Sequence, residues 1–134
     1  MTIDRKTLRP WSAATRTAGT ASPGLVGKWE NELGSIMTIE QFDGTNFSGT
    51  YQSAVSSDGK SVTGPLLGTV AGDALAFTVN WGTTYLSVTS WNGLLLGDGS
   101  QTYMYTLWNL SSTPESEDDV WQSIQAGADL FTQI

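Results

Sequence analysis

Short runs in which apolar residues alternate with other residues fill most of the chain. Two of these runs place on one face Leu75, Phe77, Val79 and Trp81, and Met104, Thr106, Trp108 and Leu110. Residues two apart on a β-strand point to the same side of the sheet. The pattern therefore predicts eight strands, at residues 26–32, 35–42, 46–55, 65–71, 74–81, 85–97, 101–110 and 122–132.

Turn signals separate these runs about every ten residues, among them Asp43-Gly44, Asp58-Gly59 and Asp98-Gly99. Short strands at this spacing are typical of an all-β sandwich or barrel. Consecutive hairpins favour an up-and-down barrel, because a closed sheet has no exposed edge. We predict an all-β fold, an eight-stranded antiparallel up-and-down β-barrel whose interior is wide enough for one small ligand.

Composition narrows the range of functions. The chain has 134 residues, a formal net charge of −7, and neither Cys nor His. The negative charge argues against nucleic acid and anionic membranes as partners, and no apolar run reaches the roughly 18 residues of a membrane span. Without Cys and His, thiol nucleophiles, Ser-His triads and thiolate or imidazole metal sites are excluded. We expect no catalytic residue, no metal and no cofactor.

Basic residues gather at the N-terminus, where Arg5, Lys6, Arg9 and Arg16 outnumber Asp4. Residues 1–23 contain no apolar segment of the kind found in a signal peptide. We predict that residues 1–23 form a flexible basic arm and that residues 24–134 form the barrel. Trp11 lies in this arm and receives no role.

Hydrogen-bonding side chains recur on the predicted inner faces, spaced by two residues or a multiple of two from aromatic or aliphatic ones. The polar members are Asn31, Ser35, Tyr51, Ser53 and Asp129, and the aromatic ones include Trp81, Trp91 and Trp108. A face that mixes an aromatic wall with a few polar groups is typical of a ligand pocket. Asp129 carries most weight, because a buried carboxylate without a partner is costly.

Five stretches of the chain resemble the avidin–streptavidin family of biotin-binding proteins. Residues 27–35, 49–55 and 121–132 resemble its bacterial members, and residues 65–69 and 77–81 resemble its egg-white member. The stretches occur in family order and at family spacing, and the likeness spans residues 24–134. It implies a barrel that holds one biotin, usually within a tetramer, and a secreted protein.

The resemblance assigns roles to the polar residues. It implies that Asn31, Ser35 and Tyr51 donate to the urea oxygen of biotin, and that Ser53 and Asp129 accept from the urea N–H groups. Three donors on one oxygen draw negative charge onto it, as in an oxyanion hole. The bond to Asp129 would be charge-assisted.

Other interpretations of the same polar residues stay open. Asn31 and Ser35 are also suited to shaping the tight turn at Leu33-Gly34. Tyr51 is also suited to be an ordinary barrel aromatic whose hydroxyl finds a backbone partner.

The resemblance also implies the walls and the rim of the pocket. Trp81, Trp91 and Trp108 would enclose the ring and the valeryl chain, together with Val55 and Leu110. Thr89 would face the thioether sulfur of biotin. Ser87 and the backbone N–H groups near Ser56 and Ser57 would bind the carboxylate of biotin.

The loop at residues 56–64 is the predicted lid over the pocket. Ser56-Ser57-Asp58 stands there where bacterial members have Gly-Asn. The connection from Trp81 to Trp91 is shorter than theirs, and its Thr83 and Thr84 are candidates for additional hydroxyl contacts. Trp29 is predicted to be core, low in the barrel.

Trp121 marks the expected assembly. In tetrameric members of the family this Trp closes the pocket of a neighbouring subunit, so the resemblance implies a homotetramer. The alternative is that Trp121 packs on its own barrel. Reciprocal exchange between identical subunits would follow from their symmetry.

Non-catalytic binding and sequestration of biotin is the function that the sequence favours. A lipocalin-like carrier of another, apolar ligand is the alternative, although such a ligand would leave the polar belt unpaired. An enzyme that uses Asp129 with Tyr51 lacks a His, Cys or basic partner for acid–base chemistry. We therefore expect that the protein is not an enzyme.

Overall fold

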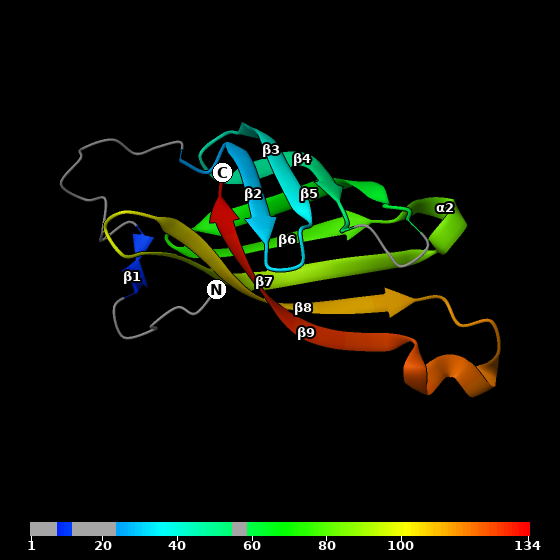
Figure 1. Ribbon diagram of the computed structural model, residues 1–134. Helices are drawn as coiled ribbons and strands as arrows, with labels where there is room; N and C mark the ends of the chain where they lie inside the picture. The colour runs from blue at the N-terminus through cyan, green and yellow to red at the C-terminus, as the bar shows by residue number, and fades with distance from the viewer. Residues whose placement is uncertain (1–7, 12–23, 55–58) are drawn as a thin grey trace.

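The computed structural model describes residues 8–11, 24–54 and 59–134. Its elements are β1 (Arg9–Pro10), β2 (Gly27–Asn31), β3 (Ile36–Phe42), β4 (Asn46–Gln52), β5 (Thr63–Ala71), β6 (Ala74–Asn80), α2 (Gly82–Tyr85), β7 (Ser87–Gly97), β8 (Thr102–Ser112), the 3-10 helix η2 (Glu117–Gln122) and β9 (Ile124–Gln133). Each strand from β2 to β8 pairs antiparallel with the next one along the chain, and β9 returns to β2. The predicted eight-stranded up-and-down barrel is confirmed (Figure 1).

The predicted strands agree with the observed ones apart from their ends. β4 stops at Gln52 and not at residue 55, and β9 begins at Ile124 and not at residue 122. The prediction that a strand begins at residue 85 is wrong, because residues 82–85 form the single helical turn α2. Gly82 opens it with φ +86°, and its N–H donates to Asn80 Oδ1 at 2.8 Å. Leu86 ends it in a left-handed conformation. These local bonds outweigh the β-propensity of the intervening Thr and Tyr residues.

The inward face of each strand supplies the core. Its fully buried large side chains are Trp29, Met37, Ile39, Leu66, Phe77, Val79, Met104 and Phe131. The prediction of Trp29 as core is confirmed, and its Nε1–H donates to the carbonyl of Leu25 at 3.0 Å. The Phe77 and Trp91 rings stack with their centroids 4.8 Å apart and their planes at 15°, so aromatic packing forms part of the core.

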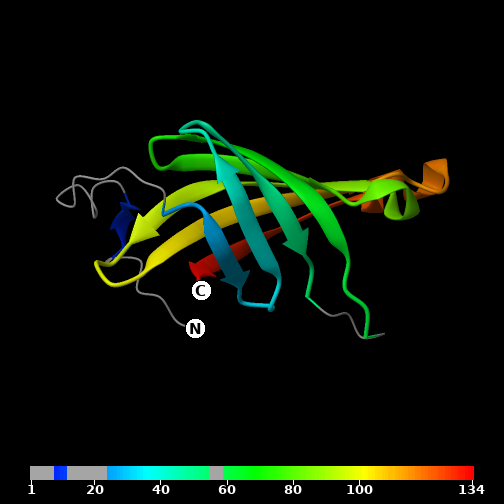
Figure 2. The same ribbon diagram turned by 90° about the horizontal axis from the view of Figure 1, so that it is seen from above.

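The short strand β1 lies at one end of the barrel, opposite α2 and η2 (Figures 1 and 2). It pairs with the last residues of β7, through Arg9 with Gly97 and Pro10 with Leu96. Trp11 follows and packs against the core, over Gly24, where a Cβ would lie 2.6 Å from its ring. Residues 1–7 and 12–23 fall outside the described part, so the flexible arm stays a prediction.

No helix in the described ranges is long and apolar enough to cross a membrane. Within the same ranges, no group of three or more acidic, Cys or His side chains is placed to hold a metal ion.

Candidate functional site

A cavity of about 240 Å³ lies inside the barrel at the end that carries α2. Its lining residues are Ser53, Val62, Trp81, Tyr85, Ser87, Thr89 and Leu110. Five of the seven are candidate site residues of the sequence, which the fold brings together from β6, β7, β8 and the end of β4. The sequence analysis missed Val62 and Tyr85. Val62 continues the two-residue step of Gly64 and Leu66, whereas Tyr85 belongs to the unpredicted α2.

Four further polar residues of the predicted site are buried and are not part of the lining of this cavity. They are Asn31, Ser35, Tyr51 and Asp129, and their exposed fractions are only 7%, 6%, 3% and 6%. Asn31 Nδ2 lies 3.4 Å from the Tyr51 hydroxyl, which is also hydrogen-bonded to Ser35. Strands or turns from three parts of the chain therefore aim polar groups at one interior region.

Asn31 shapes the β2–β3 turn and faces the interior with the same amide. Its Oδ1 accepts the backbone N–H groups of Leu33 at 3.0 Å and Ser35 at 2.9 Å. The turn interpretation is therefore confirmed for Asn31. It is compatible with a ligand role, because occupying Oδ1 fixes the amide so that the Nδ2 donor faces inward.

The hydroxyls of the site are held in place by donors from the protein. Ser35 Oγ accepts from the Ala54 N–H and Ser53 Oγ accepts from the Val62 N–H, both at 2.9 Å. Thr89 Oγ1 accepts from Trp81 Nε1 at 2.8 Å. A hydroxyl that already accepts one bond keeps its own proton to donate and a second lone pair to accept. The site is thus oriented in advance for a polar ligand.

Aromatic rings surround this polar region. The Tyr51 ring packs edge-on against Trp81, with ring centroids 5.8 Å apart. It packs at a tilt against Trp91, with ring centroids 4.8 Å apart. Trp108 lies directly across from Trp91 in the β7–β8 pairing. Its ring occupies the space that a side chain at Gly127 would need, since a Cβ there would lie 2.5 Å away. The three candidate tryptophans therefore come together, and their contact with a ligand stays a prediction.

Asp129 is the buried carboxylate of the site. Its Oδ2 accepts from Trp91 Nε1 at 2.9 Å, and the Thr106 hydroxyl donates to its backbone carbonyl at 3.0 Å. Burial raises the pKa of Asp129 to about 6; the Trp91 bond opposes this rise and the nearby charge of Glu32 adds to it. Burial likewise raises the pKa of Tyr51, so its phenol is a neutral donor at physiological pH.

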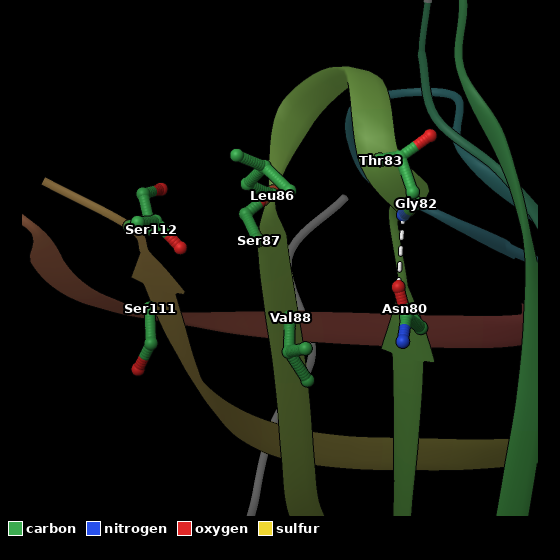
Figure 3. A pocket seen from close by; sticks show the side chains of 9 residues that line it. Asn80, Gly82, Thr83, Leu86, Ser87, Val88, Ser111 and Ser112 are labelled. Atoms are coloured by element: carbon green, nitrogen blue, oxygen red, sulfur yellow. Dashed lines mark hydrogen bonds between the residues drawn. The ribbon is translucent and has the colours of Figure 1, made fainter. Parts of the chain in front are cut away.

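A second hollow of about 480 Å³ lies on the outside of the barrel, beside α2 (Figure 3). Its lining residues are Asn80, Gly82, Thr83, Leu86, Ser87, Val88, Ser111, Ser112 and Thr113. Ser87 borders both hollows. Thr83, a candidate for ligand contact, belongs to this outer groove, because α2 turns it away from the strand face.

Trp121 stands apart from the cavity on η2, with 81% of its surface exposed. Its neighbours Val120 and Ile124 are 55% and 65% exposed. The alternative that Trp121 packs on its own barrel is therefore wrong. Three further candidates, Val55, Ser56 and Ser57, fall outside the described residues together with Asp58.

Known proteins share this barrel and its sequence pattern. A sequence model of the Avidin family matches residues 20–134. The chain belongs to the avidin family. It is 34% identical to afifavidin from Afifella pfennigii over 116 residues, which cover 84% of this chain and 70% of that protein. It is 30% identical to avidin from Gallus gallus over 118 residues, which cover 82% of this chain and 78% of that one.

Solved structures of avidin-family proteins agree with this assignment. The crystal structure of xenavidin aligns with a TM-score of 0.71 and 33% identity, over 85% of this chain and all (100%) of that one. The X-ray structure of a biotin binding protein from chicken aligns with a TM-score of 0.72 and 34% identity, over 83% and 96% of the two chains. The family resemblance is confirmed, and avidins are binding proteins rather than enzymes.

Proposed function

We propose that this avidin-family protein binds biotin inside its barrel and performs no chemistry on it. The observation that carries the proposal is the buried set of oriented polar groups next to a cavity lined by Trp81, whose ring contacts Tyr51. Asn31, Ser35 and Tyr51 donate to the urea oxygen. Ser53 and Asp129 accept from the two urea N–H groups.

The chemistry of the site suits a cyclic urea. Donors converging on the urea oxygen polarise it, and the N–H groups opposite then bind more strongly to acceptors. Asp129 is mostly ionised above pH 6, so it can accept a charge-assisted bond at neutral pH. An apolar ligand would leave unused the donor and acceptor positions that these buried groups do not fill with protein partners, which disfavours a lipocalin-like carrier.

The upper cavity suits the rest of the ligand. Thr89 and Trp81 face the thioether ring, and Leu110 contacts the aliphatic chain. Ser87 at the rim binds the carboxylate, together with backbone N–H groups of Ser56 and Ser57. Val55 completes the wall on the lid side, and no cofactor takes part.

Assembly into a homotetramer completes the site. Trp121 on η2 has 81% of its surface exposed, which supports insertion into a neighbouring pocket. Exposed apolar side chains on the outer face, such as Leu67, Leu94 and Leu107, suit burial between subunits. The same family likeness supports secretion.

Native mass spectrometry with and without excess biotin tests the proposal. Four biotins on a four-chain ion would support the site and the assembly together. Two on a two-chain ion would keep the site and reject the tetramer. No added mass would reject biotin as the ligand. Calorimetry on Tyr51→Phe, with Tyr105→Phe on the outward face of β8 as the control, then locates the site.

A further inference from the structure

One side chain closes the seam between the first and last strands of the barrel beside the polar site. Backbone pairing of β2 with β9 ends at Asn31 opposite Phe131. The next N–H of β9, that of Leu130, donates to Glu32 Oε2 at 3.0 Å. The Glu32 carboxylate thus accepts the hydrogen bond that the carbonyl of a neighbouring strand would otherwise accept. This bond holds the carboxylate at Leu130, the residue next to Asp129.

We propose that Glu32 is a positioning residue that controls whether Asp129 carries a proton, and thereby makes ligand binding depend on pH. The proposal rests on the role of Asp129 as an acceptor for the urea. Glu32 itself touches no ligand in this arrangement, because it is exposed on the β2–β3 turn. It acts through its negative charge and its place on the seam.

The groups packed around Asp129 define what can influence it. From β7, Trp91 donates to its carboxylate, and from β2, Asn31 adds a second side-chain hydrogen bond. Tyr51 on β4 is titratable but stays neutral, because burial raises its pKa. Among the residues that the structure describes, Glu32 is the charged neighbour that acts on Asp129, and its charge and hydrogen bond both favour the protonated form.

A negative charge beside a carboxyl group disfavours its ionised form, so Glu32 adds to the effect of burial on Asp129. Burial and Glu32 together hold the pKa of Asp129 near 6. A protonated Asp129 loses the charge-assisted bond and can accept only a weaker, neutral hydrogen bond from a urea N–H. Because only the ionised fraction forms the strong bond, affinity should fall by up to about tenfold for each pH unit below 6.

Glu32→Gln tests the proposal, because its amide oxygen still accepts the Leu130 N–H while the charge is gone. Glu30→Gln is the matched control, since Glu30 is exposed on β2 and its removal changes the net charge equally. Competition assays would compare biotin affinity at about pH 7.5 and pH 5. We expect a loss of about tenfold in the wild type and in Glu30→Gln, and of about threefold or less in Glu32→Gln.

A readout without ligand separates this inference from the proposed function. The Trp91 indole N–H donates to Asp129, so its NMR resonance reports the protonation of that carboxylate. It should titrate near pH 6 in the wild type and at lower pH in Glu32→Gln. Equal midpoints in the two Gln variants would overturn the role of Glu32. A shifted midpoint without any biotin binding would support that role and reject biotin as the ligand.

Discussion

Replacing Asp129 by Asn should make the ligand-free protein more stable at neutral pH. Asn has the shape of Asp and keeps an oxygen to accept from Trp91, but it carries no charge. In the wild type the folded-state pKa of Asp129, about 6, lies above its usual value of 3.8. Folding therefore disfavours the ionised form, and the fold loses stability as pH rises from about 4 to 6 and stays at that lower level above.

The size of the effect follows from this displacement. A rise from 3.8 to about 6 corresponds to about 3 kcal/mol at most. Water and salt at the open end of the barrel screen part of this, so we expect about 1–2 kcal/mol of added stability in Asp129→Asn near pH 7. Near pH 4 the wild-type carboxyl is mostly protonated when folded, and most of the difference should vanish.

Urea unfolding followed by tryptophan fluorescence measures this difference at both pH values. Asp98→Asn is a control for which the change in stability at neutral pH should have the opposite sign. Backbone N–H bonds from Ser100 and Gln101 lower the pKa of Asp98, so its ionised form stabilises the fold above pH 4. Asp98→Asn should therefore lose stability at neutral pH. An Asp129→Asn protein that is less stable than the wild type near pH 7, or equally stabilised at both pH values, would refute the reasoning.

The remaining predictions concern binding, assembly and the far end of the barrel. Tyr51→Phe should weaken biotin binding about tenfold by calorimetry, because one hydrogen bond to the urea oxygen is lost; an unchanged affinity would remove Tyr51 from the site. Trp121→Ala should shift sedimentation toward smaller species and speed biotin release, and the cross-subunit role fails if neither changes. Trp11→Ala should lower the free energy of unfolding by about 1–3 kcal/mol and leave affinity intact, since Trp11 packs on Gly24 far from the cavity; unchanged stability would show that this contact contributes nothing.

The barrel could be predicted from the sequence because each strand buries one face, which imprints a period of two on the residues. The same period located Tyr51, Ser53 and Asp129 on inner faces. Features that depend on local hydrogen bonds could not be predicted from this period. The turn α2 depends on the positive φ of Gly82 and on a bond to the Asn80 side chain.

Contacts between distant parts of the chain could not be predicted from the sequence either. Glu32 and Leu130 lie 98 positions apart, and a single exposed Glu in a turn carries no signal of such a bond. The two-residue strand β1 was also missed, because two residues are too few to show a period and Pro10 disfavours strand structure.

The position of β1 has a consequence for shortened forms of the protein. β6 stops pairing with β7 at Leu94, and β7 continues to Gly97. Without β1, the backbone of Leu96 and Gly97 would be a bare strand edge, which invites pairing with another molecule. Pro10 in turn supplies no N–H through which β1 could recruit a further strand. A chain cut back to its avidin-like residues would thus keep its pocket and become prone to aggregation.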